Sequence, residues 1–355
     1  MNQGCIARIF GFVFVFFCCW SVYGSQQGAF DLERWNSIVD GVRSRALTAG
    51  VSEKVISDVL RAPAFIPSIV KSDKNQAEFK LTLEQYLGRT VSDKRIKNGR
   101  KMRATYPTML SNVEKKYGVP SHVILAFWGL ESNYGEIKSR HRLTDAFITL
   151  MYDGRRETFF GNQLISLMQI ADKNKLNIND IYGSWAGAMG HFQFIPTTLA
   201  QYGVDGNYDG RIDIINSIGD AMHSAGNYLG KLGWNKNQRI VRRVVLPADF
   251  DLKLLDGKTK MPLSYWSQAG VMNPDGTSIP VVDMEAGLVA DVASIESARV
   301  QIIADATIDT GLDSDVAPQP VISAYLTYPN FYRIKKWNNS NWYAIAIAEL
   351  ADNLK

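Results

Sequence analysis

The chain has 355 residues, 46% of them hydrophobic and 21% charged, an ordinary composition for a globular protein with one large domain and one smaller one. Its 39 basic and 35 acidic residues leave a formal charge of +4, and the basic residues are dispersed, which argues against a nucleic-acid-binding stripe. All three cysteines, Cys5, Cys18 and Cys19, lie near the N-terminus, so the rest of the chain excludes a disulfide scaffold and a cysteine-ligated zinc site.

The first 24 residues have the pattern of a secretory signal peptide. Arg8 precedes an apolar run, residues 9–20, and small or polar residues follow up to Gly24, where we expect cleavage. The run is too short for a comfortable membrane span, so we expect an exported, periplasmic protein with no stable span after cleavage. A lipid anchor at Cys18 or Cys19 is disfavoured because bulky residues precede them, and an uncleaved anchor is the other alternative.

From residue 30 to about residue 234, apolar residues recur at helical spacing between short connections. Three serines, Ser52, Ser92 and Ser121, are expected to cap helices. The helix that Ser92 opens should run to about residue 117, and the one that Ser121 opens should close at 133–135. Further helices are predicted over 143–152, 157–174 and 218–232.

Near Asn235 the pattern changes to β-branched runs bounded by Pro, Asp and Gly. Two such runs, 240–246 and 298–303, predict strands, and residues 274–276 predict a turn. We therefore expect a small antiparallel β module over 236–321. Residues 343–350 return to helical spacing, so the module is expected to be inserted into an α domain formed by 25–235 and 322–355, in an α+β fold that is mainly α.

Several kinds of site are disfavoured because their motifs are absent. The sequence contains neither a His-Glu-x-x-His pair nor, after the first 24 residues, any cysteine, so a zinc hydrolase is not expected. It contains no Gly-x-Ser-x-Gly elbow, and the glycine cluster 183–190 lacks the lysine of a phosphate-binding loop. The four histidines show no metal-ligand spacing, and we interpret each as structural or exposed.

Glu131 is the strongest candidate for acid–base chemistry. It ends an otherwise apolar helix, residues 123–130, where burial and the negative end of the helix dipole both disfavour an ionised carboxylate. Both effects raise the expected pKa toward neutrality, which is how an enzyme makes a general acid from Glu. The alternative is a Glu side chain that turns to solvent at the helix end.

Two clusters of aromatic and polar residues suit a carbohydrate ligand. The first, 183–196, combines glycines with Ser184, Gln193 and Phe194, and small residues let the backbone approach a ligand closely. The second, 330–343, alternates aromatic and amide side chains, which offer flat apolar faces beside neutral hydrogen-bonding groups. The alternatives are a glycine-rich turn packed under a helix and a capped helix start with aromatic core residues.

Residues 205–216 partly match an EF-hand calcium loop. Positions 1, 3, 5, 7 and 9 of that loop would be Asp205, Asn207, Asp209, Arg211 and Asp213, with glycine at position 6. Position 12 is normally a bidentate Glu but here is Asn216, which cannot offer two anionic oxygens. We therefore expect either a structural Ca²⁺ of reduced affinity or a simple Asp/Asn/Gly turn, and we expect no cofactor to be required for catalysis.

Taken together, these segments resemble the lytic murein transglycosylase B family. The matching pieces fall in family order from about residue 72 to the C-terminus: 129–135, 143–150, 155–156, 183–190, 192–196, 205–213, 330–331, 337–340 and 343–344. Each piece alone is a weak signal, but the ordered set is specific. The resemblance therefore favours the functional interpretation of each segment over its structural alternative.

The resemblance implies a lysozyme-like α domain around a deep substrate groove, with the β module inserted. It implies that Glu131 is the single catalytic residue and that the protein binds peptidoglycan glycan strands. We expect a monomer, and other cell-wall enzymes are candidate protein partners. The residues implied to bind substrate are Ser184, Gln193, Phe194, Arg155, Arg156, Asn338, Tyr343, Trp337, Phe159 and Tyr86. Relatives have Tyr where this chain has Trp337 and Phe159, which puts the hydrogen bonds of those two hydroxyls in doubt.

The activity implied by the resemblance is cleavage of the β-1,4 bond between N-acetylmuramic acid and N-acetylglucosamine without water, which leaves a 1,6-anhydromuramyl end. Glu131 would act first as acid and then as base, and the acetamido group of the substrate would replace a second carboxylate. The alternatives are a lysozyme-type hydrolase with Asp145 or another acid as its partner, a non-catalytic wall-binding protein, and a calcium-regulated binding module.

Overall fold

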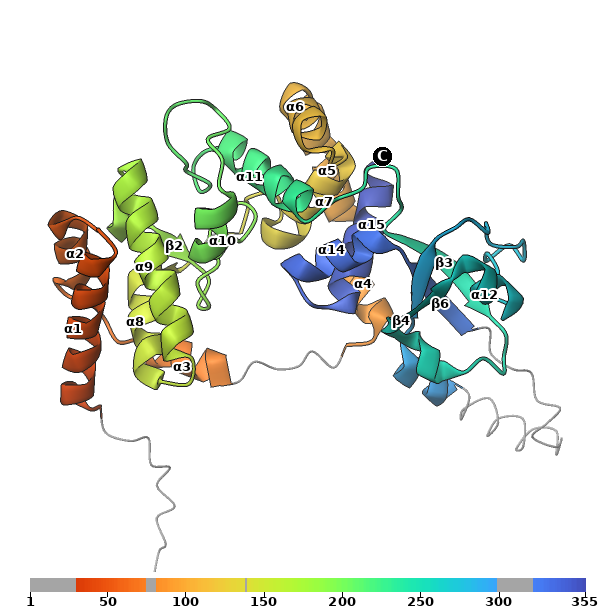
Figure 1. Cartoon of the computed structure of the whole chain (residues 1–355), viewed down its shortest axis with the longest axis horizontal. Coiled ribbons are helices and arrows are strands. Elements are labelled where there is room, and N and C mark those ends of the chain that lie inside the picture. Colours follow the sequence, from red (N-terminus) through yellow and green to blue (C-terminus); the bar gives the residue numbers. More distant parts are fainter. Residues whose placement is uncertain (1–29, 75–80, 138, 299–321) are drawn as a thin grey trace, which may run out of the picture.

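The computed structural model describes residues 30–74, 81–137, 139–298 and 322–355. The predicted signal peptide, residues 1–24, lies outside these residues. The described part is mainly helical with small antiparallel sheets, so the predicted fold class is confirmed (Figure 1). Within this part, none of the helices has both the length and the apolar character needed to cross a membrane.

The N-terminal part of the described chain consists of helices joined by short turns. They are α1 (Leu32–Thr48), α2 (Glu53–Leu60), α3 (Pro67–Lys74), α4 (Leu83–Thr90), α5 (Asp93–Thr105), α6 (Pro107–Tyr117) and α7 (Ser121–Ser132). Ser92 caps α5 as predicted, but the long helix expected from Ser92 to residue 117 is two helices. Pro107 has no N–H with which to continue α5, and it occupies the first turn of α6, where proline is well tolerated.

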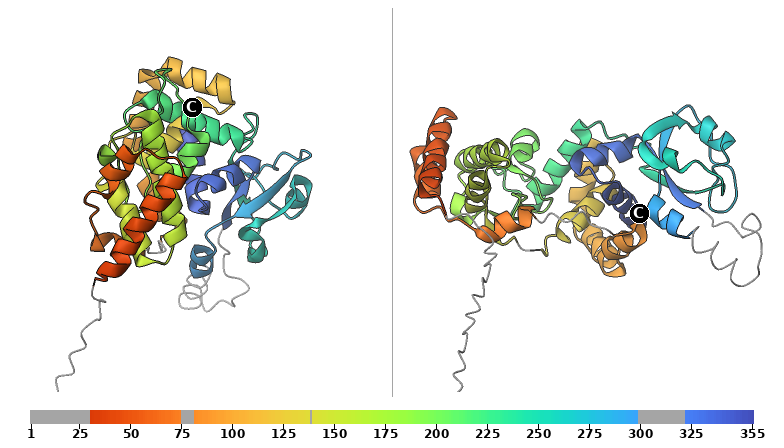
Figure 2. Two further views of the ribbon diagram at one scale, coloured as in Figure 1. Left: turned by 60° about the vertical axis from the view of Figure 1, so that its left-hand side comes forward. Right: turned by 90° about the horizontal axis from the view of Figure 1, so that it is seen from below.

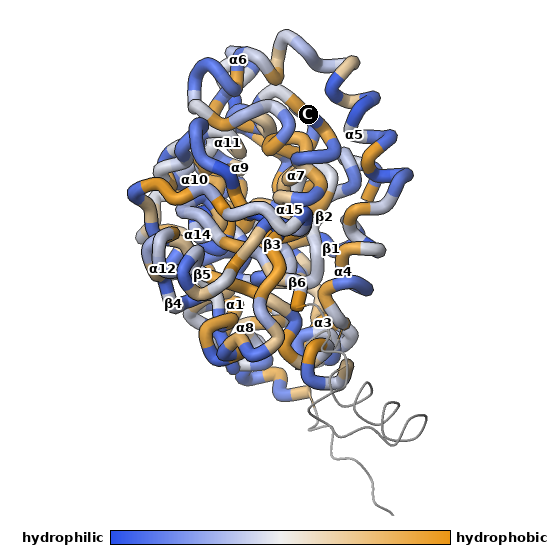
Figure 3. The backbone as a smooth tube through the Cα atoms, turned by 90° about the vertical axis from the view of Figure 1, so that its right-hand side faces the viewer, coloured by the Kyte–Doolittle hydropathy of each residue, from blue (hydrophilic) through white to orange (hydrophobic). Residues whose placement is uncertain are grey.

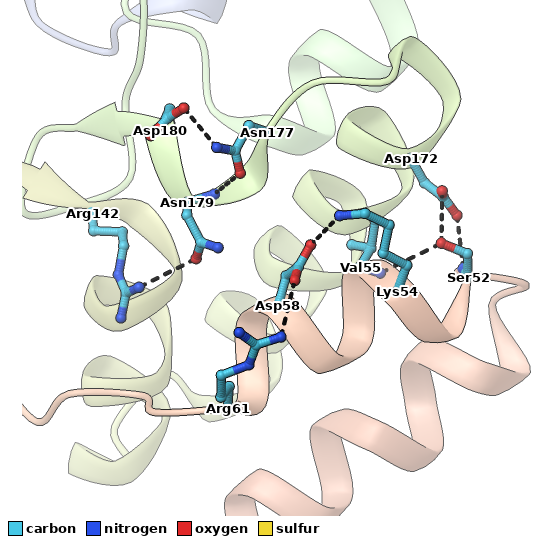
Figure 4. Close-up of polar contacts among 10 residues, drawn as sticks. All are labelled: Ser52, Lys54, Val55, Asp58, Arg61, Arg142, Asp172, Asn177, Asn179 and Asp180. Carbon is cyan, nitrogen blue, oxygen red and sulfur yellow. Dashed lines mark hydrogen bonds and ion pairs between the residues drawn. The ribbon is translucent and has the colours of Figure 1, made fainter.

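Ser52 both starts α2 and docks it on α9 (Glu157–Asn174). Its hydroxyl accepts from the Val55 N–H, which confirms the predicted cap. The same hydroxyl donates to the Asp172 carboxylate at 2.8 Å, and the Ser52 N–H donates to the other oxygen of that carboxylate at 2.7 Å (Figure 4). The cap residue therefore fixes the position of α2 against the helix that it packs on.

Helix α7 is buried along most of its length, with residues 123–129 all buried. The predicted Ser121 cap is wrong, because the N-cap position is Pro120, and the Ser121 hydroxyl instead donates to the Glu114 carboxylate at 2.6 Å. The predicted end is confirmed: Asn133 adopts a left-handed conformation, with φ of 49°, which stops the helix. Glu131 is thus the last residue but one of a buried helix.

The central part of the chain adds further helices and a two-stranded ribbon. Its elements are β1 (His141–Arg142), α8 (Leu143–Asp153), α9, η1 (Ile178–Asp180), β2 (Tyr182–Gly183), α10 (Pro196–Tyr202) and α11 (Ile218–Lys231). The helices predicted over 143–152, 157–174 and 218–232 are confirmed to within a residue at either end. Because β1 pairs with β2 in antiparallel register, the start of α8 lies beside the glycine-rich turn that begins at Gly183.

The second sheet is antiparallel and has the order β3-β6-β5-β4. Its elements are β3 (Val241–Leu246), η2 (Leu252–Leu255), β4 (Asp256–Pro262), α12 (Leu263–Gln268), β5 (Glu285–Val289) and β6 (Ile322–Thr327). The predicted strand over 240–246 and the turn at 274–276 are confirmed. Ala298 lies in a helical turn, and the rest of the strand predicted over 298–303 lies outside the described residues.

The predicted boundary of the β module at residue 321 is wrong. Strand β6 begins at Ile322 and pairs with β3 along its whole length and with β5 along part of it, so the sheet cannot close without residues 322–327. The chain then returns to helix in α14 (Pro329–Trp337) and α15 (Asn341–Asn353). The sheet lies between α11 and α14 in the chain and includes residues up to the end of β6.

Two hydrophobic cores correspond to the two parts of the molecule. The larger core joins the helices and includes α7, α8, α9 and α15, while the smaller core lies around the sheet and includes Trp266 of α12. In the right-hand view of Figure 2, α1 and the larger sheet lie at opposite ends of the molecule, with α7, α14 and α15 between them. Figure 3 shows hydrophobic segments gathered in the interior around α7 and β3.

Candidate active site

Glu131 receives two hydrogen bonds from the C-terminal helices. The indole Nε1–H of Trp337, the last residue of α14, donates to its Oε1 at 2.9 Å, and the Tyr343 hydroxyl on α15 donates to the same oxygen at 2.5 Å. In the described part of the chain, no protein hydrogen bond reaches Oε2. Oε1 already accepts from two donors. When the carboxyl group of Glu131 is neutral, its proton is therefore on Oε2.

The environment of Glu131 favours a carboxyl group that is partly protonated at neutral pH. Burial raises the pKa of Glu131 to about 7, and the hydrogen bonds from Tyr343 and Trp337, which favour the charged form, keep it from rising further. The predicted upward direction of the pKa is confirmed, with burial as its cause. The residue as a whole keeps part of its surface exposed.

Trp337 supplies a hydrogen bond that the sequence had left in doubt. Relatives are expected to have Tyr here, so that Trp337 would lack a hydroxyl donor. The indole N–H of Trp337 nevertheless donates to Glu131, since tryptophan is a hydrogen-bond donor that cannot accept. Trp337 therefore contacts the catalytic candidate through a hydrogen bond of its own.

Tyr86 on α4 lies close enough to Glu131 to interact with its charge. Burial raises the pKa of the Tyr86 hydroxyl, and the negative charge of Glu131 raises it further. The pKa of Tyr343 is also raised, first by burial and then by Glu131, with a smaller effect from Tyr86. The structure thus places Tyr86, Tyr343 and Trp337 around one carboxyl group, although they come from three different helices.

A group of aromatic side chains extends from Trp337 away from Glu131. The Trp337 ring lies 4.7 Å from Phe127, 5.2 Å from Phe194 and 4.9 Å from Tyr228, measured between ring centroids. Tyr228 of α11 stacks in turn on Tyr202 of α10 at 4.4 Å. Both tyrosines keep part of their surface exposed, so they form an aromatic wall beside the acid.

Sequence analysis missed Tyr202 and Tyr228. Tyr228 lies in the helix predicted over 218–232 and Tyr202 lies in no individually predicted element, and nothing in the local sequence places either near Trp337. The available signal was the aromatic character of two partly polar helices, α10 and α11, next to the glycine-rich segment. That signal could not be used without knowing how these helices pack.

The glycine-rich segment forms a tight turn that holds Ser184, Gln193 and Phe194. Gly187 has φ of 95° and its Cα faces Phe147 so closely that an added Cβ would lie 2.2 Å from that ring, which explains the glycine. The Ser184 hydroxyl accepts from the Ala188 N–H at 3.1 Å, and the Gln193 amide donates to the Gly190 carbonyl at 2.9 Å. The hydroxyl proton of Ser184 is left to donate to a ligand.

Contacts between side chains connect this turn to Glu131. Phe194 contacts Trp337, and Trp337 donates to Glu131, so the turn and the acid share one wall. Asn338 follows Trp337 directly and is exposed at the end of α14. A cavity of about 890 Å³ lies elsewhere, between α4, α15 and β6, so the substrate groove expected around Glu131 stays a prediction.

A family model described as the transglycosylase SLT domain matches residues 34–352. The chain belongs to the transglycosylase SLT domain family. SltB3 from Pseudomonas aeruginosa, solved in complex with NAG-NAM-pentapeptide, is 32% identical, with a TM-score of 0.79 over 90% of this chain and 79% of that chain. The family predicted from the ordered motifs is therefore confirmed.

Two further relatives are similar to this chain. Membrane-bound lytic murein transglycosylase B from Escherichia coli (strain K12) is 27% identical over 274 residues, and the match covers 75% of this chain but only 65% of that relative. The Escherichia coli lytic transglycosylase Slt35, in a structure with calcium, is 23% identical with a TM-score of 0.72, covering 90% of this chain and 92% of that chain. At that identity, the second likeness shows a shared fold.

The predicted arginine pair, Arg155 and Arg156, lies in the turn between α8 and α9. Arg155 and Arg156 both contact the Asp73 carboxylate on α3, and Arg155 also bonds to Asp153 at 2.7 Å. Phe159, on the first turn of α9, is 42% exposed and packs edge-on against Phe160. No hydrogen bond or ring contact connects these side chains to Trp337 or Glu131 in the described residues, so their role in binding stays a prediction.

Asp145, the partner considered for a hydrolase, is already engaged. Its two oxygens accept from the Nε and Nη2 atoms of Arg142, each at 2.7 Å, and one of them also accepts from the Ala64 N–H. The side chain is buried at the start of α8. A carboxylate held in this way by a bidentate arginine is part of the framework rather than a second catalytic acid.

The predicted calcium loop is organised by a residue that sequence analysis missed. Asp220, fully buried in the first turn of α11, accepts from the N–H groups of Gly206, Asn207 and Asp213. An acid in the first turn of an apolar helix was a visible signal, but its partners lie 7 to 14 residues away in the loop. The buried carboxylate fixes the backbone of the loop.

The loop side chains bond mainly to the loop itself. Asp205 accepts from the N–H groups of Asp209 and Gly210, and the Asn216 side chain donates to Asp213 at 2.8 Å. In the described part of the chain, no three His, Cys, Asp or Glu side chains are arranged around a common metal position. The potential ligands are still all oxygen atoms, including the carbonyl of Arg211, which is the chemistry that Ca²⁺ prefers.

Proposed function

We propose that this protein is a lytic transglycosylase that cleaves the β-1,4 bond between N-acetylmuramic acid and N-acetylglucosamine in peptidoglycan and leaves 1,6-anhydromuramyl ends. The observation that carries the proposal is Glu131, a carboxyl group with a pKa near 7 and an uncommitted Oε2 beside an aromatic wall. Membership of the SLT-domain family supports it, as does the complex of the relative SltB3 with NAG-NAM-pentapeptide.

In the first step, Glu131 donates its Oε2 proton to the oxygen of the leaving N-acetylglucosamine as the glycosidic bond breaks. The acetamido oxygen of the muramyl sugar stabilises the electron-poor C1 from within the substrate, and this assistance replaces a second carboxylate. The Ser184 hydroxyl, whose oxygen accepts from Ala188, orients that acetamido group with its free proton. The new carboxylate is stabilised by the donors on Oε1, Trp337 and Tyr343.

In the second step, ionised Glu131 takes the proton from the C6 hydroxyl of the muramyl sugar. The C6 oxygen closes on C1 and displaces the acetamido oxygen, which gives the 1,6-anhydro ring and restores the neutral acid. No water is consumed. One group serves as acid and then as base, which requires a pKa near the working pH, and the pKa of about 7 meets that requirement.

The aromatic wall is the proposed site for the sugar rings. Trp337 and Tyr228 keep part of their surface exposed, and stacking on aromatic rings is a common way to bind carbohydrate. Phe194 is buried and packs edge-on against Trp337, which helps to hold the Trp337 ring in place. Gln193 and the exposed Asn338 supply neutral hydrogen bonds at the edge of this wall. We assign Arg155, Arg156 and Phe159 to the part of the site that meets the stem peptide.

Mass analysis of the muropeptides released from purified sacculi tests the proposal. We expect ends that are lighter than reducing ends by one water molecule, because the C6 hydroxyl replaces water as the nucleophile. A lysozyme-type hydrolase would give reducing ends and would contradict the mechanism. Release of no soluble product, with retained binding to sacculi, would instead indicate a wall-binding protein.

We also propose that the loop 205–216 binds Ca²⁺ weakly through Asp205, Asn207, Asp209 and the Arg211 carbonyl. Ca²⁺ at about 5 mM should raise the midpoint of thermal unfolding by about 1–2 °C, which corresponds to about 1 kcal/mol for a dissociation constant on the order of 1 mM. The shift should vanish in Asp205→Asn and persist in Asp275→Asn, a change at an exposed turn of the β module. An equal shift in both variants would contradict a site in this loop.

Export follows from the proposed substrate, because peptidoglycan lies outside the cytoplasm. We propose that residues 1–24 direct export to the periplasm and that cleavage follows Gly24. N-terminal sequencing of the protein recovered from a periplasmic fraction should begin at Ser25. Recovery only from the cytoplasmic fraction would contradict export.

A further inference from the structure

Asp73 is a buried acid with no role in the mechanism above. It lies next to the end of α3, its side chain is 2% exposed, and each of its two oxygens contacts a different arginine, Arg155 and Arg156. Nearby, Asp153 bonds to Arg155 at 2.7 Å and to Lys74 at 3.3 Å. One carboxylate thus holds two neighbouring guanidinium groups side by side.

The cluster keeps both positive charge and free donors on its outer side. Arg155, Arg156 and Lys74 bring three positive charges, and Asp73 and Asp153 bring two negative ones, which leaves +1. The guanidinium groups bond inward through Nε and Nη2 of Arg155 and through Nη2 of Arg156. Their side chains are 46% and 43% exposed, so the other N–H groups can meet a ligand.

This arrangement does more to fix geometry than to stabilise the fold. Buried ion pairs contribute little net stability because both charges lose water, and their usual effect is to specify one arrangement. The Arg156 guanidinium also lies 4.9 Å over the Phe160 ring, which restricts its plane. Without Asp73, two adjacent like charges would move apart.

We propose that Asp73 is a positioning residue that holds Arg155 and Arg156 as a paired donor site for one carboxylate of a peptidoglycan stem peptide. The inference rests on the proposed function, and it assigns recognition of the stem peptide to a residue of α3. Two neighbouring guanidinium groups can each donate to one oxygen of a carboxylate. The net charge of +1 fits a single carboxylate.

The test compares two substrates. Asp73→Asn keeps the shape of the side chain but removes its charge, and KM is measured on glycan strands with stem peptides and on strands stripped of peptides by an amidase. We expect KM to rise about tenfold on peptide-bearing strands, the effect of one misplaced charge-assisted hydrogen bond. KM on stripped strands and kcat on both should stay unchanged.

A second variant and a control separate positioning from damage to the fold. Arg155→Lys keeps the charge but loses the planar fork, so it should show the same selective rise. Asp58→Asn, which breaks surface ion pairs with Lys54 and Arg61 on α2, should leave both substrates unaffected. Asp73→Glu should recover part of the effect because it restores the charge.

Three results would overturn the inference. An equal rise of KM on both substrates would mean that Asp73 serves the fold alone. A fall of KM on peptide-bearing strands would mean that Asp73 masks the arginines, since removal of a negative charge then strengthens binding. If Asp73→Asn and Arg155→Lys both kept the wild-type ratio of KM values for the two substrates, the stem peptide would bind elsewhere. Failure of the wild type to cleave either substrate would contradict the proposed function instead, and calorimetry with the two substrates would then supply the same comparison.

Discussion

Replacement of Glu131 by Gln is expected to lower the rate of peptidoglycan cleavage by about 10²- to 10⁴-fold, because an amide can neither donate nor take up the transferred proton. Gln has nearly the same shape, and its carbonyl oxygen can still accept from Trp337 and Tyr343. The aromatic wall should therefore be unchanged. The measurement is the initial rate of muropeptide release from sacculi, together with the amount of protein that sediments with them.

Glu136→Gln is a matched control for this variant. Glu136 is an exposed acid in the turn after α7, where it accepts from Asn133. The Glu136→Gln variant should cleave peptidoglycan at the parental rate. If Glu131→Gln also released muropeptides at the parental rate, Glu131 would not be the catalyst. If it lost binding and activity together, Glu131 would be holding the site together rather than reacting.

The sequence predicts those features of the active site that depend on a local pattern of residues. Residues 123–130 are apolar at every position, so a buried helix was expected, and one acid at its end is unusual for that environment. An acid that closes a wholly apolar helix is expected to be at least partly buried, and burial is what raises the pKa of Glu131. Helix α7 and the property of its acid could therefore be predicted from one segment.

The contacts that define the site depend on segments far apart in the chain. Trp337 and Tyr343 lie 206 and 212 residues from Glu131, and Tyr228 reaches the site only because α11 packs against α14. Family resemblance named the first two, but it suggested that a hydrogen bond could be lost at Trp337. In this chain the indole N–H of Trp337 supplies a hydrogen bond to Oε1 of Glu131 without a hydroxyl group.

Two of the errors in the fold share one physical origin. Strand β6 was assigned to the α domain because its membership of the sheet depends on pairing with β3, which begins 81 residues earlier, from Val241 to Ile322. The predicted Ser121 cap failed because Ser121 lies inside the helix, one residue after the N-cap Pro120, where its N–H and its hydroxyl both donate to Glu114 of the preceding helix. In both places a tertiary contact decided between two locally acceptable arrangements.

The raised pKa of Glu131 also has a consequence for stability. The carboxyl group titrates near 4.5 when unfolded and at about 7 in the folded protein. Below pH 4 it is neutral in both states and has little effect. As the pH rises, the unfolded chain ionises first, so the folded state loses relative stability until Glu131 itself ionises above pH 7. The difference between 4.5 and about 7 corresponds to about 3 kcal/mol.

Glu131→Gln is therefore expected to be more stable than the parent at pH 8, by about 2–3 kcal/mol, and equally stable at pH 4. The comparison requires urea unfolding of both proteins at the two pH values, with Glu136→Gln as the exposed control that should show no difference. A stability gain at pH 4, or none at pH 8, would mean that the folded protein does not hold the carboxyl group near neutrality. The proposed acid–base role of Glu131 would then fail as well. The catalytic effect and the stability effect both depend on the raised pKa of this one side chain.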